Sequence, residues 1–109
     1  MRQGKVFVNG IFAGILTEES QHKFIFEYDS EYMTSPAARS VCLSMPVSVQ
    51  RYESDTLFPF FSNMLSEGEN RKMQARYHRL DEHDDFGILL ATASYDTIGC
   101  VTVKPIDLK

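Results

Sequence analysis

The polar run from His78 to Asp85 is the densest set of side chains in this chain that could do chemistry. Its eight residues include two histidines and four carboxylates, the groups that ligate divalent cations and transfer protons. The spacing does not suit a metal. His78 and His83 are five residues apart, so they do not share the i, i+4 face of a helix, and the aspartates lack the central glycine of a calcium loop. We interpret the run as a solvated acidic face and predict no metal site.

Asp85-Phe86-Gly87 repeats the tripeptide that binds magnesium in protein kinases, and the segment from His78 to Asp81 is close to their catalytic loop. Only three residues separate Asp81 from Asp85, whereas the two kinase elements need a hairpin between them to meet at one phosphate. The 109 residues also contain no glycine-rich nucleotide loop. The pattern favours a helix N-cap followed by a core phenylalanine, and we predict no catalytic residue and no cofactor.

The remaining reactive residue types form no constellation. Cys42 and Cys100 are the only cysteines, and in a chain with ample apolar residues two cysteines are more typical of reduced, buried thiols than of a disulfide. The net charge of −4 disfavours direct nucleic-acid binding, because phosphate contacts need clustered positive charge. One positive patch has roughly helical spacing: Arg71, Lys72, Arg76 and Arg79. It is typical of a solvated face, with an acidic partner surface or a phosphate as the alternatives.

The elements that must position these residues begin with strands. Alternation over Lys5 to Asn9, the Asn9-Gly10 pair of a type I′ turn, and a return over 11–17 predict a hairpin. Gly14 marks a bulge or a close backbone approach. A third strand is expected over 22–29. Beyond it, 30–40 is turn-rich with a single helical turn around 31–33.

The middle of the chain has an alternating apolar segment that contains a proline, followed by a polar segment. Apolar residues at alternate positions of 38–49 predict a strand, with Pro46 at an edge or a bulge. We expect 51–55 to be polar and irregular, with Asp55 and Thr56 available to cap the next helix.

The stretch from Leu57 to Arg71 organises the rest. Pro59 suits the first turn of a helix, and the apolar residues share one face: Phe58, Phe61, Met64 and Leu65. Gly68 suits a left-handed C-cap. A second helix is expected from Glu69 to residue 77 or 80, a third from 86 to 91 or 93 capped by Asp84 or Asp85, and a last strand over 99–104.

These elements predict one domain over 1–109 of the α+β class. We expect a small antiparallel, strongly curved sheet or partial barrel, with two to three short helices inserted before the last strand. No segment has the form of a signal peptide or of a membrane-spanning helix, which predicts a soluble, cytoplasmic protein without membrane contact. From the residues alone we expect a non-catalytic interaction domain.

Several motifs, in this order and spacing, resemble the N-terminal subdomain of HipA-type toxin kinases. They are the hairpin at 6–16 (VFVNGIFAGIL), the segment at 43–48 (LSMPVS), the helix at 60–68 (FFSNMLSEG) with Arg71 beyond it, and the segments at 85–90 (DFGILL) and 96–100 (DTIGC). The nucleotide loop and catalytic carboxylates of those kinases lie beyond the part resembled here. A separate domain of this kind is similar to the HipS antitoxins of three-component HipBST systems.

The resemblance implies an antitoxin that docks on the N-lobe of a HipT-like serine/threonine kinase toxin and inhibits it, the toxin's targets being aminoacyl-tRNA synthetases. A HipB-like helix-turn-helix protein in the same complex would contact DNA. The alternatives are a non-inhibitory accessory subunit that completes the kinase or bridges it to the HipB-like protein, and a small-molecule-binding domain. Polar residues at motif positions are the expected partner contacts: Asn63, Glu67, Arg71 and Asp96. Asn63 and Glu67 at a helix end, and Asp96 at a turn, have structural roles as their alternative. The loop from Tyr32 to Arg39 is a further candidate.

Overall fold

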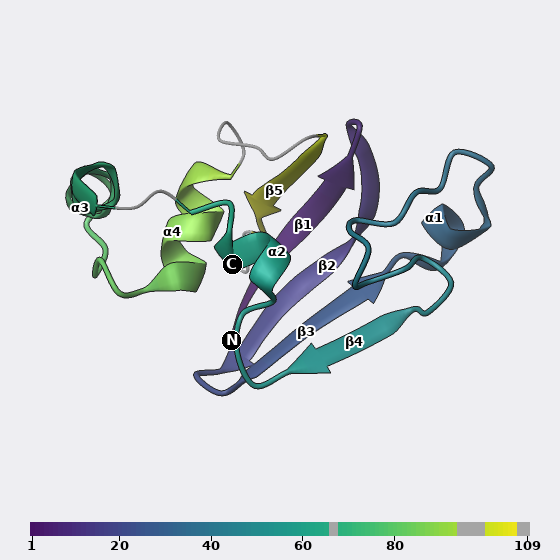
Figure 1. Cartoon of the computed structure of the whole chain (residues 1–109), viewed down its shortest axis with the longest axis horizontal. Helices are drawn as coiled ribbons and strands as arrows, with labels where there is room; N and C mark the ends of the chain where they lie inside the picture. Colours follow the sequence, from purple (N-terminus) through teal and green to yellow (C-terminus); the bar gives the residue numbers. More distant parts are fainter. Residues whose placement is uncertain (66–67, 94–99, 107–109) are drawn as a thin grey trace.

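The computed structural model describes residues 1–65, 68–93 and 100–106. Within them an open five-stranded antiparallel sheet has the order β4-β3-β2-β1-β5. Its strands are β1 (Arg2–Val8), β2 (Ile11–Ser20), β3 (Lys23–Tyr28), β4 (Arg51–Ser54) and β5 (Val101–Pro105). Along the chain, the helix α1 (Ser30–Thr34) follows β3. Three helices follow β4 and precede β5 in the sequence: α2 (Pro59–Ser62), α3 (Gly68–Tyr77) and α4 (Asp85–Thr92) (Figure 1). The predicted α+β class is confirmed; the sheet is open and does not close into a barrel.

The first hairpin forms as its turn residues predict. Asn9 and Gly10 both have positive φ, 53° and 78°, as a type I′ turn requires. The register between β1 and β2 shifts after Val6, and Gly14 lies in β2 opposite Tyr28 of β3. A Cβ at Gly14 would lie 2.3 Å from the Glu27 carbonyl oxygen, so only glycine allows the strands to approach this closely. The expected irregularity at Gly14 is therefore a close backbone approach beside a bulge.

Helices cover one face of the sheet because alternate residues of the strands are apolar. Phe26 on β3 contacts Phe61 of α2, with ring centroids 5.9 Å apart, and Phe24 contacts Phe86 of α4 at 6.2 Å. Leu89 of α4 is fully buried in the same core. This face therefore joins the sheet to α2 and α4 and supports the segments around them.

The middle of the chain differs from expectation. The predicted strand over 38–49 is wrong: the segment consists of turns with one isolated bridge, Cys42 to Met45, because it runs across the core face instead of extending the sheet. Only part of the alternating set is buried: Val41 and Met45 pack into the core from this loop, whereas Leu43 between them is fully exposed. The residues expected to be irregular form β4, whose Tyr52 pairs with Phe26. Pairing with a neighbouring strand, which local sequence does not reveal, decided both outcomes.

The stretch around Phe61 also differs in length. Phe58, Phe61 and Met64 are buried as predicted, but α2 ends at Ser62 and its N-cap is Phe58, so neither Asp55 nor Thr56 caps it. Gly68 has the predicted positive φ, 62°, yet it begins α3 and does not end α2. The predicted helix over 86–93 is α4, and Asp84 is its N-cap, as expected. None of the helices in the described ranges is long and apolar enough to span a membrane.

Candidate partner interface

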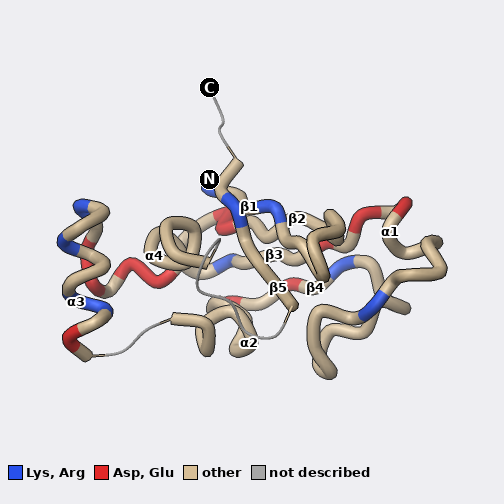
Figure 2. Tube along the Cα trace, turned by 90° about the horizontal axis from the view of Figure 1, so that it is seen from above, with Lys and Arg blue, Asp and Glu red and all other residues tan. Residues whose placement is uncertain are grey.

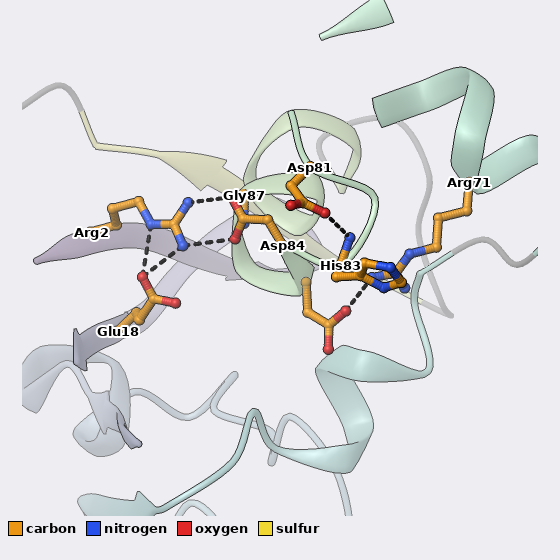
Figure 3. Close-up of polar contacts among 8 residues, drawn as sticks. Arg2, Glu18, Arg71, Asp81, His83, Asp84 and Gly87 are labelled. Carbon is orange, nitrogen blue, oxygen red and sulfur yellow. Dashed lines mark hydrogen bonds and ion pairs between the residues drawn. The ribbon is translucent and has the colours of Figure 1, made fainter. Parts of the chain in front are cut away.

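The polar run from His78 to Asp85 leads into α4 and supplies its N-cap. The Asp84 side chain accepts a hydrogen bond from the Gly87 backbone N–H at 3.1 Å, which makes it the N-cap. Arg2 of β1 donates two bonds of 2.8 Å to the Asp84 carboxylate and a third to Glu18 of β2 (Figure 3). The hydrogen bond from Arg2 holds the pKa of Asp84 below its usual range, and Asp84 raises the pKa of Arg2. This cluster joins α4 to the sheet.

Phe86 completes this arrangement from the core side. It is buried, and the Arg2 guanidinium lies over its ring, 5.4 Å from the centroid. The interpretation of Asp85-Phe86-Gly87 as the start of a capped helix with a core phenylalanine is thus confirmed, with Asp84 as the capping residue. Among the described residues, no group of three His, Cys, Asp or Glu side chains is placed to hold a metal ion.

Arg71 fastens α3 to the first residue of α4 and to the segment before it. Its Nε donates to the Glu82 carbonyl oxygen at 2.6 Å, and its Nη2 pairs with the Asp85 carboxylate. The Arg71 side chain is only 21% exposed, so most of it is covered by these contacts. Of the four predicted contact residues, Arg71 therefore has a structural role within the domain.

Of the other three predicted contacts, the structure describes only Asn63, and all remain predictions. Asn63 is the C-cap residue of α2 and is exposed; its backbone N–H donates to the Pro59 carbonyl at 2.9 Å. Asn63 therefore caps the end of α2 through its backbone, as its structural alternative expected, and its side chain lies at the surface. Glu67 and Asp96 lie outside the described residues. The two predicted contact residues that the structure describes, Asn63 and Arg71, do not contact each other.

The helix α3 presents a surface that the motif residues did not indicate. It stands at one end of the molecule, with α4 between it and the sheet (Figure 1). Ala75 is its only buried residue, whereas Met73 is 63% and Tyr77 is 83% exposed. Lys72 and Arg76 are exposed beside them, and Figure 2 shows the positive charges gathered along this helix. We call Lys72, Met73, Arg76 and Tyr77 the outer face of α3.

The loop over 35–50 is held in place by buried tyrosines. Tyr28 accepts a hydrogen bond from the Val41 N–H at 2.8 Å and donates to the Met45 carbonyl, and burial raises the pKa of its hydroxyl to about 12. Tyr32 bonds both backbone groups of Arg39 at 2.8 Å. The predicted candidate loop, Tyr32 to Arg39, is thus anchored at both ends.

The face of the sheet opposite the helices forms a third candidate surface. A hollow there is lined by apolar residues of β2 and β3, among them the half-buried Phe12 and Ile15 and the buried Ile25. Charged residues surround it, and Arg51 pairs across the strands with Glu27 at 3.4 Å. The alternation of apolar and charged residues in 5–29 indicates that the strands have two different faces, but it does not reveal which face the helices cover.

Comparisons with known proteins agree with this architecture. The family model described as the HipA N-terminal domain matches residues 4–104. An uncharacterised protein of Haemophilus influenzae is 36% identical over 104 residues, which are 95% of this chain and 92% of that protein. A solved structure, the N-terminal domain of HipA toxin, is similar with a TM-score of 0.75 and 31% identity, over 100% of this chain and 96% of that chain. The members of the matched family are N-terminal domains of the HipA type, which are not kinase domains.

Proposed function

Because the chain belongs to the family of HipA N-terminal domains, we propose that it is an antitoxin that binds and inhibits a HipA-like serine/threonine kinase toxin. In this proposal it acts in the cytoplasm as a HipS-like protein. It docks on the N-lobe of a HipT-like kinase, and a HipB-like helix-turn-helix protein in the same complex contacts DNA.

The observation that carries the proposal is the extent of the Haemophilus influenzae relative. This chain aligns with 92% of it, so that protein consists of little more than this one domain. A domain found in a toxin, and found also as a protein of about its own size, can bind the remainder of such a toxin from a separate chain. The net charge of −4 is consistent with a partner that is a protein and with DNA contact by another subunit.

The physical basis of the inhibition is reversible occupancy. A domain joined covalently to a kinase has a fixed and high effective concentration, whereas a separate chain dissociates, so its occupancy depends on its own concentration. Inhibition then follows the amount of antitoxin present relative to the dissociation constant. Docking either covers the active-site cleft or holds the N-lobe in an unproductive conformation.

The test is a kinase assay with the HipA-like kinase of the same genome, titrated with this protein. Inhibition that saturates near one equivalent, together with restored growth on co-expression, is the expected result. A stable complex with undiminished phosphorylation would refute inhibition and favour the non-inhibitory accessory subunit. A kinase that does not bind the protein at all would refute both roles.

A further inference from the structure

The helix α3 has an organisation that its own domain does not explain. It has ten residues, and isolated helices shorter than about 12 to 15 residues are marginal in water. Tertiary packing normally stabilises such a helix, yet only Ala75 is buried against the rest of the protein. The two large apolar side chains of the helix, Met73 and Tyr77, project into solvent.

These two side chains form a continuous patch because they are one helical turn apart. Residues at i and i+4 are neighbours on a helix surface, so Met73 and Tyr77 lie together on the side opposite Arg71 and Ala75. Methionine, tyrosine and arginine are enriched in the buried centres of protein interfaces. A single exposed leucine such as Leu43 is ordinary at a surface, but this pair and its neighbours have the composition of an interface.

The charge of the helix indicates the chemistry of its partner. α3 carries three basic residues and one acidic residue in a chain whose net charge is −4. Arg71 is already engaged with Asp85, but Lys72 and Arg76 are exposed, one turn apart, beside the apolar pair. Their nearest acidic neighbour on the helix, Glu69, is 3.8 Å from Lys72, an exposed ion pair of little strength.

We propose that the outer face of α3 docks into an apolar groove with an acidic rim on the partner kinase, an inference that rests on the proposed function. Tyr77 and Met73 fill the groove, and Lys72 and Arg76 meet carboxylates at its rim. Arg71 positions this face, because its bonds to Asp85 and the Glu82 carbonyl fix the rotation of α3 about its axis. The Arg71 side chain itself need not touch the kinase.

The test compares two kinds of variant for binding to the HipA-like kinase of the same genome by surface plasmon resonance. Tyr77→Ala and Met73→Ala keep helix propensity, so α3 should persist in both. We expect each to weaken binding by about tenfold or more, chiefly through faster dissociation. Lys72→Glu with Arg76→Glu should slow association and reduce its dependence on salt, because rim charges act mainly on encounter.

Matched controls come from the hairpin and the open face of the sheet. Ile11→Ala removes an exposed apolar residue, and Lys5→Glu reverses an exposed charge, both away from α3. These controls should bind like the parent protein, and circular dichroism should show the same helix content for all variants. If the parent protein binds the kinase and the α3 variants bind equally well, the inference is overturned and the proposed function stands. If the parent protein does not bind, the proposed function fails first.

Discussion

Substituting Gly87 by alanine should destabilise this protein, although alanine is the better helix former. A Cβ at Gly87 would lie 2.3 Å from the Asp84 Oδ2 atom and 2.9 Å from Nη1 of Arg2. The Asp84 carboxylate must therefore move. It would lose its bond to the Gly87 N–H and its paired bonds with Arg2.

The magnitude follows from those contacts. Loss of an N-cap costs about 1 kcal/mol. The ion pair adds up to about 1 kcal/mol, limited by solvent screening because the Arg2 side chain is 40% exposed. Alanine returns about 1 kcal/mol through helix propensity. The net loss is about 1 kcal/mol, which corresponds to a fall in Tm of about 4 to 8 °C for a domain near 100 residues.

The sign of the effect should reverse when the obstructing carboxylate is removed. In an Asp84→Ala background the carboxylate is absent and only the end of the flexible Arg2 side chain must shift, so Gly87→Ala should raise Tm by a similar amount. Asp84→Asn is the matched control, since asparagine caps as well as aspartate and has the same size, and there Gly87→Ala should still lower Tm. Thermal and urea unfolding of the six proteins measures this coupling. An equal change in all three backgrounds would refute the assigned position of the Asp84 side chain.

Three further perturbations have outcomes that the structure specifies. Because Arg2 lowers the pKa of Asp84, the ionised carboxylate adds stability that is present above the ordinary aspartate pKa of about 3.9 and is lost as pH falls through the lower folded pKa. In a series of unfolding experiments at decreasing pH, the stability difference between the parent protein and Asp84→Asn should therefore vanish. A difference that stays constant with pH would contradict the ion pair. Gly14→Ala should cost about 3 kcal/mol or more, because its Cβ meets the Glu27 carbonyl oxygen and a strand must shift, and urea unfolding measures the loss. Arg71→Leu should leave the core intact but remove hydrogen-exchange protection from α3, whereas unchanged protection would show that Arg71 does not tether the helix.

The sequence alone determined the elements whose signals are local. The Asn9-Gly10 turn, the N-cap at Asp84 and the positive φ of Gly68 each depend on the conformational preferences of one or two residues. The α+β class and the buried face of Phe58, Phe61 and Met64 followed from periodicity. The resemblance to HipA N-terminal domains rests on motifs that lie within residues 4–104, the range that the family model matches.

Tertiary structure decided everything that depends on which surfaces meet. Val41 and Met45 pack into the core from a loop, and the polar residues of β4 pair with β3, because a strand exists only where it has a neighbour. Arg71, a predicted partner contact, also bonds to the Glu82 carbonyl and the Asp85 carboxylate within the chain, and its place in the sequence does not reveal these bonds. Tyr77 and Met73, at positions that look ordinary for a helix, are exposed because α3 touches the domain on its opposite side alone. Periodicity reveals that a helix has faces, but only the packing around it determines which face remains for a partner.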